Sequence, residues 1–164
     1  MDARLVDHPA FRLVGHAARV PLIHHGINLH IQQHIAALSA EEHLRLRALG
    51  NTEPSGLLAV CDDLHPDYDE GSELTYLHGV AVSPDTPIPG DLDIIEVPAG
   101  IWVVIRSPGP YPQALQRTWA AAAAEWFPSN PWCLRPGPEI VAALKPTNDL
   151  STTAHQLWLP VEPA

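Results

Sequence analysis

The order of strand-like and helix-like patterns constrains the fold of this chain more than any other feature. Short runs rich in Val, Leu and Ile, typical of β-strands, alternate with only two helical regions. The strand-like runs span residues 11–23, 55–63, 74–82, the two parts of 92–107, 139–146 and 154–162. The order strand, helical region, strand, strand therefore occurs twice. Because hairpin-length connections join most of the strands, this order predicts an α+β fold with an antiparallel sheet.

The first helical region is predicted from apolar spacing and from capping residues. Apolar side chains recur at helical intervals over residues 27–38. Ser39 then begins a second helical segment, residues 40–49, because its hydroxyl can accept a hydrogen bond from a free backbone N–H and Glu42 can reach back. Gly50 is the expected C-cap of this segment.

The second helical region spans about residues 111–127 and is rich in Ala, the residue with the highest helix propensity. One face of this helix carries apolar side chains at intervals of three and four residues. The residues on that face are Leu115, Trp119, Ala122 and Trp126. Pro128 is expected to end the helix because it has no backbone N–H.

Glycine and proline predict bends in two of the strand-like regions. Gly15 and Pro21 interrupt residues 11–23, which predicts a bent first strand. Residues 98–100, Pro-Ala-Gly, break the run at 92–107, which predicts either a kink or a hairpin.

Charge and apolar content exclude several classes of protein. The 164-residue chain has a formal charge of −10, with 9 Lys and Arg against 19 Asp and Glu. Direct nucleic-acid binding is not expected, because it requires a cationic surface. No stretch of about 18 apolar residues and no secretion signal are present, so we expect a cytoplasmic protein without a membrane span. Neither Cys61 nor Cys133 lies in a C-x-x-C unit, so both are expected to be inert thiols.

Four histidines crowd the segment HHGINLHIQQH at residues 24–34. His24 and His25 are expected in the loop before the first helix, whereas His30 and His34 lie one helical turn apart. Zinc sites use this spacing but need a third ligand, and the H-E-x-x-H motif is absent. We therefore predict no metal site and no cofactor. His34 falls on the apolar stripe and faces the sheet, either as a hydrogen-bonded structural residue or as a pocket residue.

Five phrases follow one another along the chain: EPSGLLAV, YLHGVAVSP, LDIIEVPAGIWVVIRSPGP, LQRTWAAAAAEWFPSNPWCLRPGPEI and LWLPV. Over about residues 10–162, the chain resembles the GyrI-like (gyrase-inhibitor-like, AraC effector-binding) family. The resemblance implies one ligand-binding domain, residues 1–164. Its implied fold is α+β, with duplicated βαββ units in pseudo-two-fold symmetry, an antiparallel sheet and two main helices. It also implies a ligand cavity in a central groove that takes bulky, often aromatic and cationic compounds.

The chain departs from the family pattern at one functional position. In the family, a buried Glu pairs with cationic ligands and is implicated in hydrolytic members. Aligned on Pro138, this sequence has Val141 at the Glu position and Ala143 at a Tyr position. Glu139 lies two residues earlier, which on a strand is the same face, so it is the candidate replacement. A buried carboxylate attracts a cation strongly because little solvent screens it.

Aromatic, histidine and carboxylate side chains supply the candidate ligand contacts. Flat apolar walls with a few polar groups suit a drug-sized ligand. Paired tryptophans on one helix face fit a core role as well. The candidate ligand-binding residues are Tyr76, His78, Trp102, Trp119, Trp126, His30 and Glu125. Glu139 and His34 are the candidate catalytic residues, as acid/base groups.

Three functions stay open from the sequence. The first is a binding module that senses or sequesters a bulky aromatic drug or toxin, in a resistance or regulatory role. The second, implied by the resemblance, is a hydrolase of cyclopropane-bearing DNA-alkylating toxins, in which Glu139 or a histidine activates water. The third is an interaction protein whose acidic surface contacts gyrase or a regulator.

Overall fold

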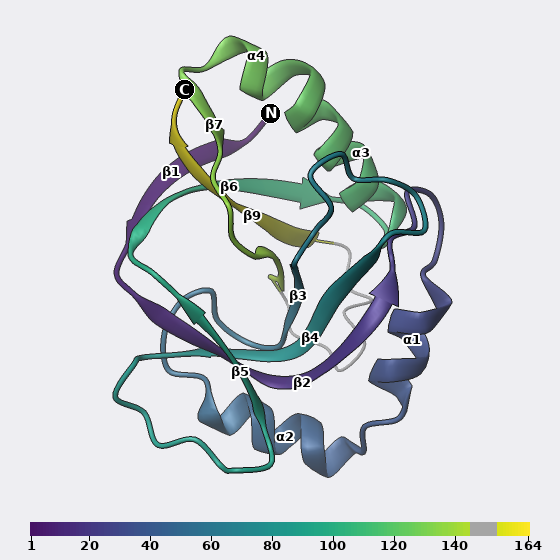
Figure 1. Cartoon of the computed structure of the whole chain (residues 1–164), viewed down its shortest axis with the longest axis vertical. Helices are drawn as coiled ribbons and strands as arrows, with labels where there is room; N and C mark the ends of the chain where they lie inside the picture. The colour runs from purple at the N-terminus through teal and green to yellow at the C-terminus, as the bar shows by residue number, and fades with distance from the viewer. Residues whose placement is uncertain (145–153) are drawn as a thin grey trace.

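A computed structural model describes residues 1–144 and 154–164, which form a curled antiparallel sheet with helices on its outer face (Figure 1). The strands are β1 (Ala3–His8), β2 (Phe11–Pro21), β3 (Leu58–Asp62), β4 (Glu73–Val82), β5 (Asp93–Val97), β6 (Gly100–Pro108), β7 (Trp132–Leu134), β8 (Glu139–Ala143) and β9 (Ala154–Pro163). The helices are α1 (Leu29–Ala36), α2 (Ala40–Leu49), α3 (Gln113–Ala121), the π-helical turn η1 (Ala122–Trp126) and α4 (Phe127–Ser129). Within the described ranges, no helix has the length and apolar content needed to span a membrane.

The strand order confirms the predicted duplication. The sheet runs β1-β6-β9-β8-β3-β4-β2-β5, β7 pairs with β9, and the pairings are antiparallel. β3 and β8 lie side by side at the centre, followed outward by β4-β2-β5 on one side and β9-β6-β1 on the other. One βαββ unit is therefore β2, α1 with α2, β3 and β4. The other is β6, α3 to α4, β8 and β9. The sequence patterns did not predict β1 and β7.

The predicted break at residues 98–100 is a kink, and the hairpin alternative is wrong. β5 pairs with β2 and β6 pairs with β1, and no ladder joins β5 to β6 in the described sheet. The register continues across the break, with His8 opposite Gly100 and Phe11 opposite Val97. β1–β2 and β5–β6 therefore form one long ribbon that bends at Pro9 and Pro98, residues that cannot donate to a ladder. Because this ribbon supplies both ends of the strand order, the sheet curls.

The two faces of the curled sheet pack against different partners. Strand residues alternate, so Tyr76 and Val80 of β4 face the helices while Leu77 and Ala81 face inward. The buried inner core consists of Phe11, Leu13, Leu58, Val60, Leu77, Ala81, Val97, Trp102, Val104, Ile140, Ala142 and Trp158. On the outer face α2 packs over β2 and β4, while α3 and η1 cover β6 and β9. α1 precedes α2 in the chain and packs beside Tyr76 (Figure 1).

The first two helices follow the predicted capping only in part. Asn28 caps α1 by accepting hydrogen bonds from two N–H groups of the first turn, so α1 begins at Leu29. Ser39 caps α2 as predicted and accepts from the Glu42 N–H at 3.1 Å. The Glu42 carboxylate does not complete the capping box, because it binds Arg45. Gly50 is the C-cap of α2 as predicted, with a φ of −60° rather than a left-handed conformation.

The third helical region runs past Pro128, contrary to the prediction. α3, η1 and α4 follow one another without a break up to Ser129. In η1 the N–H of Phe127 donates to the carbonyl of Ala122, five residues back. This wider turn comes directly before Pro128, whose missing N–H removes one α-helical hydrogen bond. The helix continues because the π turn and packing on the sheet hold it.

Candidate functional site

Glu139, at the start of β8, is a buried carboxylate held by two aromatic side chains. It is 9% exposed and shares the helix-covered face with Val141. Its Oε1 accepts a hydrogen bond from Trp119 Nε1 at 2.8 Å, and its Oε2 accepts one from the Tyr68 hydroxyl at 2.6 Å. Burial raises the pKa of Glu139, while these two hydrogen bonds lower it. Among the described residues, no lysine or arginine pairs with this carboxylate.

Tyr68 reaches Glu139 from the loop between β3 and β4. Its ring packs edge-on against Trp119, with ring centroids 5.4 Å apart. Burial raises the pKa of the Tyr68 hydroxyl, and the adjacent Glu139 raises it further. The backbone of Tyr68 has a φ of +51°, in the left-handed region that few non-glycine residues adopt. Tyr68 therefore covers Glu139 and Trp119 from a constrained loop conformation.

Tyr76 lies on the same face of the sheet as this contact, because Cys61 is paired with Tyr76 on one side and with Glu139 on the other. Tyr76 on β4 is 1% exposed, and its hydroxyl has no hydrogen-bond partner in the described structure. Burial raises the pKa of Tyr76, and the neighbouring Tyr111 raises it further. His34 of α1 meets the Tyr76 ring edge-on at 5.9 Å, and its Nε2 donates to the His16 carbonyl at 2.8 Å. We call Glu139, Tyr68, Tyr76, Tyr111 and Trp119 the Glu139 site.

His78 lies outside this site, beneath α2, although it shares a strand face with Tyr76. It is fully buried, and its ring centroid is 5.1 Å from that of His43 on α2. None of the four ring nitrogens of the pair has a hydrogen-bond partner in the described part of the chain. Burial lowers the pKa of His78 to about 4, and the neighbouring His43 adds to this effect. The pair is therefore a neutral packing element at pH 7.

The remaining candidate residues lie in separate places. Trp102 belongs to the inner core, on the face of the sheet opposite Trp119, and the Arg135 guanidinium lies 5.0 Å from its ring. Trp126 is half-buried beyond Trp119 along the helical stretch, packed edge-on against Phe127.

Two polar candidates are exposed. His30 lies on the surface of α1, and Glu125 lies on the helical stretch that follows α3. Glu125 lines a surface cavity of about 660 Å³ together with Arg106 and Arg117. This cavity does not include Glu139, so it is a second location rather than an opening of the Glu139 site.

The structure thus brings together three of the candidate residues, Glu139, Trp119 and Tyr76, with His34 beside them. Tyr68 and Tyr111 complete the site, and sequence reasoning missed both. Tyr68 lies in an acidic loop and Tyr111 in a proline-rich connector, where no periodic pattern indicates direction. Only the packing of the loop on β8 brings Tyr68 to Glu139.

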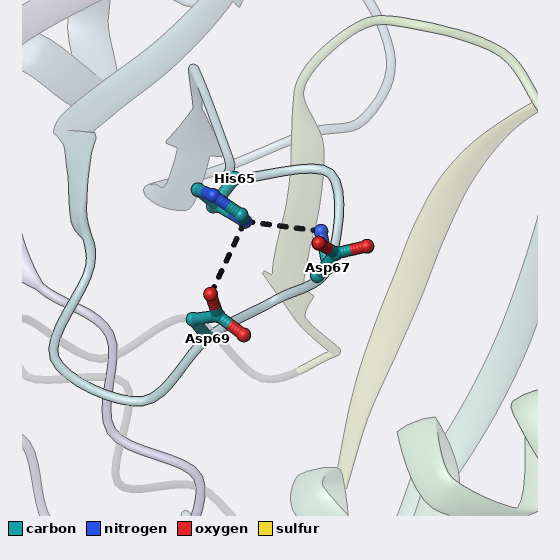
Figure 2. Close-up of side chains that lie close together, drawn as sticks. All are labelled: His65, Asp67 and Asp69. Atoms are coloured by element: carbon teal, nitrogen blue, oxygen red, sulfur yellow. Dashed lines mark hydrogen bonds and ion pairs between the residues drawn. The ribbon is translucent and has the colours of Figure 1, made fainter.

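A second polar cluster lies on the surface of the Tyr68 loop (Figure 2). His65 Nδ1 accepts a hydrogen bond from the Asp67 backbone N–H at 3.1 Å and lies 3.8 Å from Oδ2 of Asp69. One ligand atom from each of the three side chains lies within 4.8 Å of the others, and all three residues are exposed. Because the ring nitrogen already accepts a hydrogen bond, we assign no metal to this cluster. Its contacts shape the turn that carries Tyr68.

Duplicated βαββ units in one curled sheet, with a buried acidic site beside two helices, define a class of ligand-binding domains. The chain belongs to the GyrI-like family, because residues 1–162 match the GyrI-like small molecule binding domain. No curated protein sequence matches the chain.

Solved structures have the same fold. SAV2435 bound to tetraphenylphosphonium is similar over 99% of this chain and 94% of that chain, with a TM-score of 0.66 and 19% identity. The EcmrR C-terminal domain is similar over 99% of this chain and 98% of that chain, with a TM-score of 0.62 and 16% identity. EcmrR in a complex with DNA is similar over 99% of this chain and 58% of that chain, with a TM-score of 0.65 and 16% identity.

Proposed function

We propose that the Glu139 site binds a bulky aromatic small molecule that carries a positive charge, in order to sense or sequester a drug or toxin. One observation carries this proposal: Glu139 is buried among aromatic rings, and no basic side chain of the described residues faces it. A buried carboxylate without a counter-ion is costly, and a cationic ligand would supply the missing charge. Trp119 and Tyr76 offer ring surfaces for aromatic and cation–π contacts.

The similar structures support a ligand of this class. SAV2435 was solved with tetraphenylphosphonium, a cation that carries four phenyl rings. EcmrR was solved bound to DNA, and the part similar to this chain covers 58% of that protein. By analogy, ligand binding here would serve a regulator that responds to drugs, or would confer resistance by removing the free compound.

Titration with tetraphenylphosphonium tests the proposal. We expect saturable binding by the wild-type protein and binding weaker by about tenfold or more in Glu139→Gln, which keeps the shape but removes the charge. Tetraphenylborate, an anion of similar shape, should not bind. Glu125→Gln is the matched control, because Glu125 is exposed and lines the separate cavity. Equal affinities of the wild type and Glu139→Gln would contradict the proposal, as would a loss of binding confined to Glu125→Gln.

A second candidate function is hydrolysis of a cyclopropane-bearing DNA-alkylating compound at the same site. The observation that favours it is the burial of Glu139, which raises the pKa of its carboxyl group and so makes the carboxylate a stronger general base toward water. Mass spectrometry should then detect the hydrated product with the wild type and Glu125→Gln, but not with Glu139→Gln. If the wild type binds such a compound and releases it unchanged, catalysis is ruled out and binding remains the function.

A further inference from the structure

We infer that Tyr68 is an internal occupant of the Glu139 site, latched there by His24, and that a ligand enters by displacing it. This inference rests on the proposed function and adds a gate to it. The gate explains why the site is closed, since Tyr68 covers both Glu139 and Trp119.

Tyr68 makes the contacts that a cationic aromatic ligand would make. Its hydroxyl donates to Glu139 Oε2 at 2.6 Å, and its ring packs on Trp119 at 5.4 Å. Glu139 Oε1 is already engaged by Trp119, so the Tyr68 hydroxyl satisfies the other carboxylate oxygen. A ligand that places its charge at Oε2 and a ring on Trp119 therefore competes with Tyr68 directly.

The loop conformation favours release once these contacts are replaced. Tyr68 has a φ of +51°, a backbone conformation that is unfavourable for a non-glycine residue. Asp63, where the loop leaves β3, has a φ of +54°. The contacts of Tyr68 with Glu139 and Trp119 offset this cost in the closed state. When a ligand takes over those contacts, they no longer offset the strained backbone.

The segment before α1 holds the loop closed. The His24 ring donates from Nε2 to the Tyr68 carbonyl, and the His24 backbone N–H donates to the Glu70 carboxylate at 3.1 Å. Leu22 makes two further backbone hydrogen bonds to residues 71–72, each 2.8 Å long. Within the described structure, His24 is therefore the one side chain of this segment that hydrogen-bonds to the backbone of Tyr68.

The same segment is also tied to α3. The Gln116 side chain donates from Nε2 to the Gly26 carbonyl at 2.9 Å and accepts from the Gly26 N–H at 3.1 Å. α3 carries Trp119, so the latch connects the covering loop to the helix that it covers. These tethering contacts are exposed, and exposed hydrogen bonds contribute little to stability. The gate can therefore open at a modest cost, and the histidine-rich segment supplies its latch.

A gate and a fixed wall predict opposite effects of the same substitutions. If Tyr68 must leave, the apparent dissociation constant equals the intrinsic one divided by the open fraction, so loosening Tyr68 strengthens binding. If Tyr68 were a wall that contacts the ligand, removing it would weaken binding. Tyr68→Phe removes only the hydroxyl that competes for Glu139, whereas Tyr68→Ala removes the ring as well.

The test measures tetraphenylphosphonium affinity by calorimetry for the wild type, both Tyr68 variants, His24→Ala and His25→Ala. We expect binding about tenfold tighter in Tyr68→Phe and several-fold tighter in His24→Ala. His25→Ala is the matched control, because His25 is the exposed neighbour without a hydrogen bond in the described structure. It should bind like the wild type. Thermal unfolding of each variant verifies that it is folded, and Tyr68→Phe decides the question if Tyr68→Ala does not fold.

The outcomes distinguish the gate from the proposed binding function. Tighter binding in Tyr68→Phe and His24→Ala, or binding that appears only in them, supports the gate. Wild-type binding that is unchanged or weaker in Tyr68→Phe overturns the gate and leaves the binding function standing. Absence of binding in the wild type and in every variant overturns both.

Discussion

Lowering the pH from 7 to 5 is expected to destabilise the folded chain through the buried His43–His78 pair. Both rings lie between α2 and β4, and their nitrogens find no hydrogen-bond partner in the described structure. The cationic form of either ring would be buried without compensation. Arg47 lowers the pKa of His43 further, and Glu42, which is hydrogen-bonded to Arg45 and to His16, raises it without reversing the net shift.

The size of the effect follows from the pKa of His78. Burial lowers this pKa from 6.5 to about 4, so between these values the unfolded chain binds a proton that the folded chain does not. The contribution of a neutral, buried His78 to the free energy of unfolding is therefore fully present above pH 6.5 and is lost as the pH falls toward 4. At about 1.4 kcal/mol per pH unit, the loss is about 2 kcal/mol at pH 5 and about 3 kcal/mol at pH 4. The pKa of His43 is also lowered by burial, which adds a loss of the same sign.

Urea unfolding at pH 7, 6 and 5 measures this loss. His78→Leu removes the titrating ring and the unsatisfied nitrogens, so its stability should fall by about 2 kcal/mol less than that of the wild type over this range. His25→Leu, at an exposed histidine, is the matched control and should follow the wild type. The raised pKa of Glu139 acts with the opposite sign, but it is present in all three proteins and cancels in the comparison. Parallel pH profiles for the wild type and His78→Leu would refute the reasoning.

Three further predictions concern the fold. Asn28→Ala should lower stability by about 1 kcal/mol in urea unfolding, because α1 loses the side chain that caps two N–H groups; an unchanged midpoint would show that the cap contributes nothing. Gly79→Ala should cost about 3 kcal/mol or more, because its Cβ would lie 2.0 Å from the Val14 carbonyl oxygen, whereas Gly90→Ala, with open space around it, should be neutral in thermal unfolding. Trp102→Phe should lower the free energy of unfolding by about 1–2 kcal/mol, measured as a lower melting temperature, and should leave tetraphenylphosphonium affinity unchanged. Weaker binding in this variant would place Trp102 in the ligand site.

The fold was largely predictable because periodicity and element order are local properties. The strand-like run at residues 74–82 is β4, and Ser39 correctly marked the start of α2. β1 escaped prediction because its residues, half of them exposed, show no apolar alternation, and β7 because three residues are too few to show a period. The end of the third helix was misplaced because Pro128 is accommodated by a π turn, which depends on packing rather than on propensity.

The candidate site, like the fold, was predicted only in part. Trp119 could be selected from the sequence because of its helix face, and Glu139 because of the family resemblance together with the strand face that it shares with Val141. His78 shares its strand face with Tyr76, yet it lies under α2 rather than beside Glu139, because two residues along a strand are enough to pass from one helix to the next.

The sequence by itself therefore determined the duplicated βαββ order, the antiparallel sheet and the faces on which Glu139 and Trp119 lie. These follow from hydrophobic periodicity, which each segment carries independently of the others. Only the tertiary structure decided that the long ribbon bends at Pro9 and Pro98, and that a loop tyrosine covers the buried carboxylate. A loop has no period that states its direction, so the position of Tyr68 is set by the segments it meets in space.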